Sequence, residues 1–361
     1  MPYIYGKYLT KKEYFAHVGD AKQCFGIYPL LYTAGKASFI SCYDVDNAGG
    51  LRFSVNESKN LDLFSFTYKG VPFQFVTKAG LSSPWIAQEQ GMAYRNNLGA
   101  GFMYTAGLSH VGLGCEDNGF YHNVHGNLKN IPAENVAWET CWDGDSCVLK
   151  ISGETYDSAF FGRNLFLRRE ISTPVGEHRL FIRDFIENRG FNDEQIMLLY
   201  HMNLGYPVLD AGTRLLAPVQ CDTPLSEHTK GNDQDYSVMI APIDNNIEYL
   251  HDLTLKADEN GRTLSVAWNP DMNLGLYVRY NTDWLKHLIE WKCMSSGDYA
   301  LGMLPSTCIP IGRAANREGE DFRTLAPFAS FTNTLEIGVV DGTEEYMMLQ
   351  REIADILKYN R

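Results

Sequence analysis

Apolar residues that alternate with other residues are the feature of this sequence that most restricts its fold. Successive side chains of a strand point to opposite faces, so this spacing predicts strands that bury one face. Turn signals such as Tyr68-Lys69-Gly70 and Glu259-Asn260-Gly261 separate the runs at short intervals. The sequence therefore predicts a large, antiparallel, all-β protein. The clearest runs are Phe64, Phe66 and Tyr68, then Leu274, Leu276, Val278 and Tyr280, and then Leu335, Ile337 and Val339.

Helical periodicity is limited to the two ends of the chain. Thr10 followed by Glu13 has the spacing of a capping box and predicts a short helix. Residues 343–358 place apolar side chains on one helical face, which predicts a terminal helix. We therefore expect a single domain over residues 1–361, with short terminal helices and a C-terminal helical segment at 343–361.

Charge and composition exclude several classes of partner. The 361 residues include 44 Asp and Glu against 31 Lys and Arg, a net charge of −13, which disfavours nucleic acid. No run of 18 apolar residues exists, and Met1–Tyr8 lacks the apolar core of a secretory signal. The eight cysteines are scattered without a CxxC pair, which favours buried thiols in a reducing compartment. We expect a cytoplasmic protein that binds neither nucleic acid nor a membrane.

One segment, from Asn96 to Cys115, contains five glycines and no charged residue. In a β protein, glycines inside strands often mark a place where one backbone closely approaches another backbone or a ligand. The segment therefore predicts such a close approach.

Two histidine clusters are the first candidates for chemistry. His122 and His125 lie among glycines and asparagines, and His201 follows the apolar run 196–199. A histidine at the end of an apolar strand can present an acid or a base, although each of these can equally be a hydrogen-bonded structural residue. The His122-x-x-His125 spacing matches no closed zinc pattern, so we expect no metal.

Among the carboxylates, Glu290 lies in the otherwise apolar run 288–291. Two interpretations remain open for it. It is either a buried acid or a solvent-facing residue on the opposite side of the strand from Ile289 and Trp291.

Several short motifs follow one another in a characteristic order from about Gly50 to about Gly342. They are Lys59-Asn60-Leu61-Asp62, Thr105-Ala106-Gly107-Leu108, His125-Gly126-Asn127, Tyr200-His201-Met202-Asn203, Glu290-Trp291-Lys292 and Leu335-Glu336-Ile337-Gly338. In this order they resemble the galactose mutarotase-like proteins, and within them the aldose 1-epimerase-like branch, which includes a family of unknown function. The resemblance implies a β-supersandwich.

The resemblance also implies an isomerase that interconverts the α and β anomers of a small-molecule sugar without metal or cofactor. One group removes the proton of the anomeric hydroxyl and another protonates the ring oxygen, and a histidine with a carboxylate can do both. His201 matches the histidine that protonates the ring oxygen, and His125 matches the histidine that contacts the sugar. Glu290 is the candidate base. Asp62, Asn203, Lys59 and Asn127 complete the expected sugar-binding set.

The sequence departs from the branch at the position of the expected base. The branch carries a Gly-Leu-Glu-Pro-like stretch where this chain has Gly302-Met303-Leu304-Pro305, so Leu304 replaces the glutamate. The branch also favours arginine at Lys59 and Asn127. The changes leave three hypotheses: an isomerase that uses another acid such as Glu290, a catalytically silent sugar-binding or sensing protein, and a different acid–base reaction on a sugar or sugar acid. The oligomeric state stays open.

We expect His125, His201 and Glu290 to line one open cleft, and Leu304 to point into it.

Overall fold

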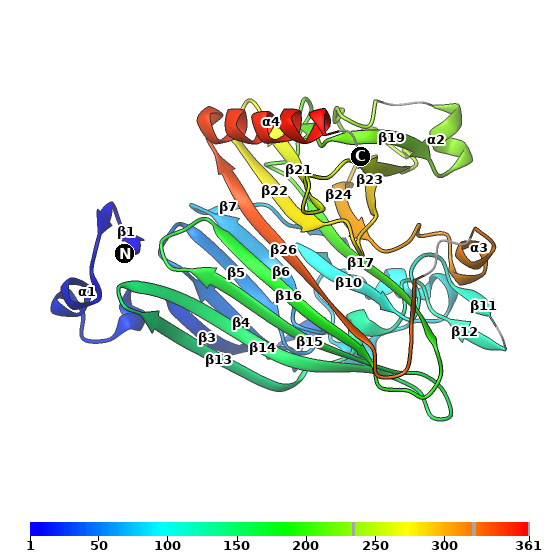
Figure 1. Cartoon of the computed structure of the whole chain (residues 1–361), viewed down its shortest axis with the longest axis horizontal. Coiled ribbons are helices and arrows are strands. Elements are labelled where there is room, and N and C mark those ends of the chain that lie inside the picture. Colours follow the sequence, from blue (N-terminus) through cyan, green and yellow to red (C-terminus); the bar gives the residue numbers. More distant parts are fainter. Residues whose placement is uncertain (118, 233–234, 320–322, 360–361) are drawn as a thin grey trace.

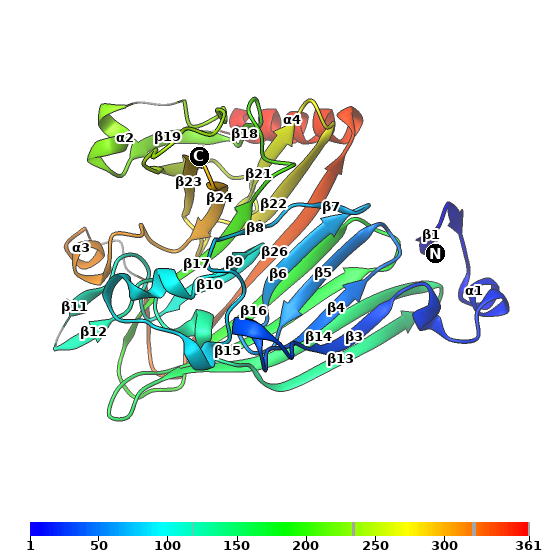
Figure 2. The ribbon, with the colours of Figure 1, turned by 180° about the vertical axis from the view of Figure 1, so that it is seen from behind.

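A computed structural model describes residues 1–117, 119–232, 235–319 and 323–359. It confirms the all-β prediction, because two large sheets make up most of the molecule and every pairing between their strands is antiparallel (Figures 1 and 2). The inner faces of the two sheets pack on each other, and helices lie at the margins.

The first sheet, which we call sheet I, carries the candidate site. Its described strands follow the order β19, β20, β23, β24, β17, β10, β6, β5, β4 and β3, with β25 beside β17 and β7 beside β6. Their bounds are β19 Val219–Pro224, β20 Tyr249–Leu255, β23 His287–Ser295, β24 Asp298–Ser306, β17 Glu194–Leu204, β10 Met103–Leu108, β6 Asp62–Tyr68, β5 Leu51–Asn56, β4 Ser41–Asp46, β3 Gly26–Leu31, β25 Arg323–Leu325 and β7 Val71–Pro72.

The second sheet, sheet II, has long strands that face sheet I. Its described strands are β13 Glu134–Asp143, β14 Ser146–Ser158, β15 Asn164–Pro174, β16 Arg179–Asn188, β26 Ser330–Asp341, β22 Leu274–Asn281, β21 Arg262–Asn269 and β18 Arg214–Leu216, in that order.

Short ribbons and helices complete the described chain. The ribbons are β1 Tyr3–Ile4 with β2 Lys7–Tyr8, β8 Phe75–Val76 with β9 Ala100–Gly101, and β11 Cys115–Asp117 with β12 Phe120–His122. The α-helices are α1 Lys11–His17, α2 Glu227–Gly231, α3 Arg313–Glu318 and α4 Thr343–Lys358, and single turns of 3-10 helix occur at η1 Ala21–Gln23, η2 Gly35–Ala37, η3 Pro84–Ile86 and η5 Leu128–Asn130, with a longer one at η4 Gly91–Asn96. Both predicted terminal helices are confirmed, and Thr10 and Glu13 form the expected capping box.

The alternating runs of the sequence form the core between the sheets. On β26, Phe331, Asn333, Leu335 and Ile337 are buried while the residues that alternate with them are exposed or partly buried. Burial becomes continuous near Val340 because α4 covers the outer face of the sheet there, with Leu349 and Ile353 packed onto that face (Figure 1). A strand that is covered on both sides loses its alternation.

A buried ionic network joins the two sheets behind the candidate site. Arg169 on β15 donates to both oxygens of Asp184, at 2.9 and 2.7 Å, and to Asp62 at 2.9 Å. Arg169 also donates to the hydroxyl of Thr105, and the hydroxyl of Tyr200 donates to Asp184, each at 2.9 Å. Thr105 and Tyr200 pair across β10 and β17, so the network fixes these two strands against sheet II.

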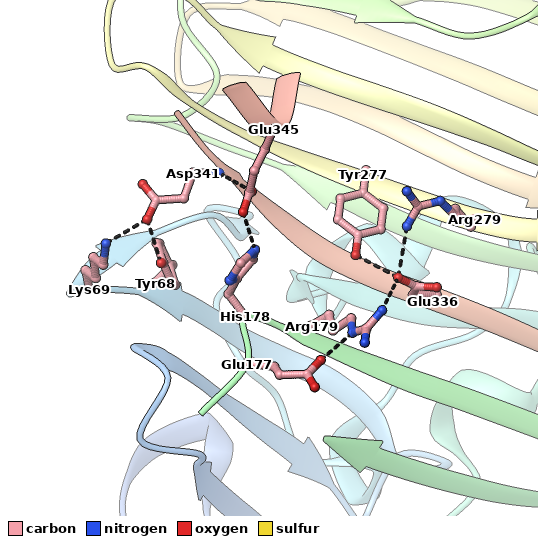
Figure 3. A network of polar contacts seen from close by, with 10 residues as sticks. All are labelled: Tyr68, Lys69, Glu177, His178, Arg179, Tyr277, Arg279, Glu336, Asp341 and Glu345. Atoms are coloured by element: carbon pink, nitrogen blue, oxygen red, sulfur yellow. Dashed lines mark hydrogen bonds and ion pairs between the residues drawn. The ribbon is translucent and has the colours of Figure 1, made fainter. Parts of the chain in front are cut away.

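A second polar network holds α4 and the edge of β6 to sheet II (Figure 3). Glu345 of α4 contacts His178 at 3.1 Å and accepts from the backbone of Asp341. Asp341 in turn binds Lys69 at 2.7 Å and Tyr68 at 2.8 Å. The other half of the network is centred on Glu336, which binds Tyr277, Arg279 and Arg179, and Arg179 also contacts Glu177.

Four of the eight cysteines are buried, and Cys221 is exposed. Within the described part of the chain, no helix combines the length and apolar character needed to cross a membrane.

Candidate functional site

His201 lies near the middle of sheet I, on β17, among aromatic side chains. It pairs with Tyr104 of β10, and the two rings stack with centroids 4.4 Å apart and planes at 17°. The ring of Trp291 from β23 meets His201 edge-on at 5.5 Å. These rings surround a largely buried imidazole with apolar surface.

The hydrogen bonds of Asn203 determine which nitrogen of His201 carries the proton. The Asn203 amide nitrogen donates to the carbonyls of Gly101 at 3.1 Å and of His201 at 2.9 Å. The Asn203 oxygen must therefore accept, and it lies 2.7 Å from His201 Nδ1. Consequently Nδ1 carries hydrogen and Nε2 presents a lone pair. Burial lowers the pKa of His201 to about 4, so the imidazole is neutral and acts as an acceptor at neutral pH.

His125 faces His201 and has the opposite tautomer. The two ring centroids lie 5.7 Å apart with the planes at 85°. The backbone N–H of Gly112 donates to His125 Nδ1 at 3.3 Å, which places the hydrogen of the neutral ring on Nε2. Burial, with His201 nearby, holds the pKa of His125 well below its usual value. His125 therefore offers a donor where His201 offers an acceptor.

The charge-free segment supplies the support for His125. The backbone of Gly107 donates to the carbonyl of His125 at 3.1 Å, and the backbone of His125 donates to Gly112 at 2.9 Å. A Cβ atom at Gly107 would lie 2.2 Å from the carbonyl oxygen of Met197, and one at Gly112 would lie 2.4 Å from that of Pro310. The predicted close approach of backbones in this segment is confirmed, and it requires glycine at both positions.

A pocket opens beside Tyr104, on the side of the site away from Trp291. Its cavity volume is about 30 Å³, and the pocket is partly open to solvent. The chain segment around Glu89, Tyr94 and Asn97 forms one wall, and Lys59, Lys129 and Asn130 contribute to the other.

Hydrogen bonds connect the polar groups of this pocket in a row. Lys59 donates to Asn130 at 2.8 Å, Asn130 donates to Glu89, and Lys129 donates to Glu89 at 2.8 Å. Burial lowers the pKa of Lys59 to about 8. Lys59 donates to Asn130 alone among the described hydrogen bonds of its ammonium group, so further donors are available to a ligand.

Two asparagine oxygens add acceptors to the pocket. Oδ1 of Asn56 and Oδ1 of Asn97 are buried and have no hydrogen-bond partner among the residues the structure describes. Both atoms have almost no accessible surface, so a ligand hydroxyl would bond to them only after nearby side chains move. Asp62 also lines the pocket, but Thr105 and Arg169 already occupy its oxygens, and burial raises its pKa to about 6.

The prediction that Glu290 lines one cleft with His125 and His201 is wrong. Glu290 pairs with Met303, whereas Leu304 is the residue of β24 that lies beside His201 in the register. Neighbouring residues of a strand point to opposite faces, so Glu290 points into the core between the sheets and away from His201.

In the core, Glu290 lies opposite His251 and near Lys292. Its two carboxyl oxygens are buried and have no hydrogen-bond partner in the described residues. Burial raises its pKa well above the usual value, which favours the protonated form. Of the two interpretations open for Glu290, the structure supports the buried acid.

Leu304 lies beside the site, as expected. It is 2% exposed and packs with Leu199, Ile289 and Tyr104 in a small apolar cluster on the His201 face of sheet I. The wall next to His201 is therefore aliphatic in this chain.

Two other predicted sugar contacts have different neighbours. Asn203 is fully buried, and its amide group holds His201, so it is a positioning residue. Asn127 accepts a hydrogen bond from Asn123 at 2.8 Å. Lys59, a further predicted contact, lines the pocket, and its ammonium group donates only to Asn130 among the described residues.

The structure also adds two carboxylates that sequence reasoning missed. Glu89 lies in the pocket, and Glu248 accepts from the indole N–H of Trp291 at 3.1 Å. Both come from stretches outside regular strands, where no periodic pattern indicates which way a side chain points. Among the described residues, no group of three or more His, Cys, Asp or Glu side chains is arranged to hold a metal ion.

Comparisons with known proteins agree with this architecture. A sequence model of the family described as "Domain of unknown function (DUF4432)" matches residues 39–339. No curated protein matches. Among solved structures, a candidate aldose 1-epimerase from Klebsiella pneumoniae superposes with a TM-score of 0.89 at 20% identity, over 98% of this chain and 92% of that one.

Two further solved structures have the same fold. A galactose mutarotase-like protein from Clostridium acetobutylicum matches with a TM-score of 0.61 at 15% identity, over 88% of this chain and 99% of that one. Galactose 1-epimerase from Lactobacillus acidophilus matches with a TM-score of 0.59 at 14% identity, over 88% and 100%. The fold is thus galactose mutarotase-like, as the sequence predicted.

Proposed function

The chain belongs to the DUF4432 family and has a galactose mutarotase-like fold, and from this premise we propose that it binds a monosaccharide or sugar derivative and interconverts its anomers. The observation that carries the proposal is a pair of neighbouring neutral imidazoles. Nε2 of His201 is a hydrogen-bond acceptor, and Nε2 of His125 is a donor. Ring opening of a cyclic sugar needs both characters around one carbon atom.

The ring-opening step is assigned to His201. Its Nε2 takes the proton of the anomeric hydroxyl as the bond between the anomeric carbon and the ring oxygen breaks. The anomeric oxygen becomes a carbonyl oxygen, and the imidazolium returns the same proton to the ring oxygen. Both oxygens are bonded to one carbon, so a single imidazole can reach each in turn. The low pKa of His201 makes its imidazolium a strong acid once it forms.

His125 acts by hydrogen bonding and keeps its proton. Its Nε2–H stabilises negative charge that develops on the ring oxygen, in the way that a neutral imidazole serves as an electrophile. Rotation about the bond next to the carbonyl carbon and reclosure on the other face complete the reaction. No carboxylate has to take part, which agrees with the aliphatic Leu304 beside His201.

The remaining surface offers groups of the kind that contact a polyhydroxylated ligand. Trp291 and Tyr104 offer aromatic rings beside the two histidines, and Lys59, Asn56 and Asn97 offer hydrogen-bonding groups in the adjoining pocket. Concave sites of this mixed character are typical of small-molecule recognition.

Anomer interconversion by the purified chain tests the proposal. Polarimetry, or exchange spectroscopy by NMR, on freshly dissolved aldoses should show faster relaxation than a buffer control. His201→Ala should slow the reaction by roughly 10²–10⁴-fold. His17→Ala changes an exposed histidine on α1 and serves as the matched control.

The same experiment separates the alternatives. Sugar binding in a thermal-shift screen without any acceleration by the unmodified chain would favour the silent sugar-binding protein. If Glu248→Gln loses the acceleration and His201→Ala keeps it, the base is Glu248, the carboxylate that accepts from Trp291.

A further inference from the structure

Three loops meet at one end of sheet II, on the far side of the molecule from α4 (Figure 1). They are residues 159–163 between β14 and β15, 189–193 between β16 and β17, and 326–329 before β26. Together they present four phenylalanines to solvent, which we call the tip patch: Phe160, Phe161, Phe191 and Phe328, exposed by 89, 92, 84 and 58%.

The four side chains form ring pairs. The rings of Phe160 and Phe161 have centroids 4.0 Å apart, and those of Phe191 and Phe328 are 5.4 Å apart at 83°. Scattered single apolar residues are ordinary on a protein surface, but grouped aromatics of this exposure mark interaction sites.

Hydrogen bonds hold the three loops together. The backbone of Arg189 donates to the carbonyl of Asn164 at 2.8 Å, and the backbone of Phe328 donates to the carbonyl of Asn188 at 2.7 Å. The Asn188 amide also donates to the carbonyls of Asn192 and Leu325, each at 2.8 Å. A partner would therefore meet a surface that is already formed, which reduces the entropy lost on binding.

Two of the four phenylalanines have left-handed backbones, with φ of +54° at Phe161 and +60° at Phe328. Bulky side chains are unfavourable there, and glycine or asparagine would be the easier choice. The chain has aromatic rings at positions that favour other residues, which points to a use for the exposed rings.

Charge at the tip differs from charge on the rest of the chain. The whole chain carries −13, whereas the three loops contain two arginines and one aspartate. Arg163 is paired with Asp157 at 2.5 Å, and Arg189 is paired with Glu187 at 2.7 Å. The tip therefore has little net charge, so two copies of this acidic chain repel each other less there than elsewhere on their surfaces.

We propose that the tip patch is a self-complementary interface through which two copies of this chain pair. A buried aromatic side chain covers about 150–250 Å². At the observed exposures the four rings offer roughly 500–800 Å² per copy, which approaches the ~800 Å² per partner of a stable interface. A twofold axis through the tip brings the same rings of both copies together, which is the usual symmetry of a homodimer.

Sedimentation velocity and light scattering on the full chain over a wide concentration range test this interface. The unmodified chain should reach twice its mass of 40.8 kDa. A double substitution, Phe160→Ser with Phe191→Ser, should raise the dimer dissociation constant roughly 100-fold or more, because central aromatic anchors dominate interface energetics. Phe39→Ser is the matched control, since Phe39 is 73% exposed, lies outside the patch and has φ of +69°.

A monomeric unmodified chain, or a double variant that dimerises as tightly as the parent, overturns the proposal. Flotation with phosphatidylcholine vesicles tests whether the tip patch binds a membrane instead. Vesicle binding that depends on the four rings would also overturn the proposal. If the double variant misfolds, Phe328→Asn gives the same test, because asparagine tolerates the left-handed backbone at that position.

Discussion

The imidazoles of His125 and His201 stand almost perpendicular, with ring centroids 5.7 Å apart, and neutral neighbours fix the proton on each ring. A backbone N–H of Gly112 and the side-chain amide of Asn203 occupy the two Nδ1 atoms. Neither neighbour is a carboxylate that would stabilise an imidazolium. Burial is the main cause that lowers both pKa values, and His201 and Lys129 add to it at His125. Both shifts favour the neutral form of the rings.

This neutrality predicts the pH dependence of turnover. The pKa of His201 is lowered from 6.5 to about 4, so the lone pair on Nε2 is present at every pH above that value. We expect kcat/KM for anomer interconversion to be flat around neutrality and to fall as the pH drops through about 4. Initial rates in buffers of constant ionic strength, corrected for catalysis by the buffer, measure the profile. A rate that increases on acidification would mean that the protonated imidazole is the working form.

Glu290 is predicted to take no part in turnover. Because its carboxyl group points away from His201, Glu290→Gln should leave kcat/KM within about twofold of the parent, whereas loss of a general base typically costs roughly 10²–10⁴-fold.

The same substitution has a defined effect on stability. Burial raises the pKa of Glu290, so the native state retains a proton that the unfolded chain has already lost, and this contribution to stability disappears as the pH rises. The free energy of unfolding of Glu290→Gln, from urea titrations, should therefore improve relative to the parent with increasing pH. A loss of activity with unchanged stability would return Glu290 to the candidate base.

The contrast between His201 and Glu290 shows what sequence reasoning reaches and where it stops. Alternation predicted the strands, and the Thr10 capping box and the apolar face at 343–358 predicted the terminal helices. Whether Glu290 faces the core or His201 depends on the register of β23. Its neighbour Ile289 points to the opposite face, so a change of one residue would exchange the two side chains. Composition and alternation are compatible with either register.

Sequence periodicity could not predict the contacts that loop residues make. Glu89 reaches Lys129 from 40 positions away in the sequence, and Glu248 reaches Trp291 from 43 positions away. The role of Asn203 was also hidden, because its amide is oriented by the backbone of Gly101 on a separate segment. Such contacts follow from tertiary packing.

Leu304→Glu tests the aliphatic wall beside His201. Directly opposed residues on neighbouring strands have Cβ atoms about 4.5–5.5 Å apart, so the new carboxylate lies within reach of the imidazole. We expect the pKa of His201, followed by NMR of the ring protons, to rise from about 4 towards neutrality. Leu304→Gln is the control, because glutamine has nearly the shape of glutamate, and burial of its neutral amide costs about 1–3 kcal/mol without introducing a charge. An identical His201 pKa in the two variants would show that position 304 does not face the ring.

Arg169→Met tests the network that fixes the strands of the site. The substitution leaves Asp62 and Asp184 buried without their cation, and breaking a buried pair in this way typically costs about 3–5 kcal/mol. Arg168→Met is the matched control: its side chain is 59% exposed and pairs with Glu154, so a change of about 0–1 kcal/mol is expected. Urea unfolding at neutral pH measures the stability of both variants.

The stability lost in Arg169→Met should also depend on pH. Without Arg169 the pKa of Asp62 should rise beyond about 6, so the native state binds extra protons. The difference in unfolding free energy between the variant and the parent should therefore narrow as the pH is lowered. Equal losses in the two variants, or a deficit that widens on acidification, would mean that Arg169 does not compensate the buried carboxylates behind His201.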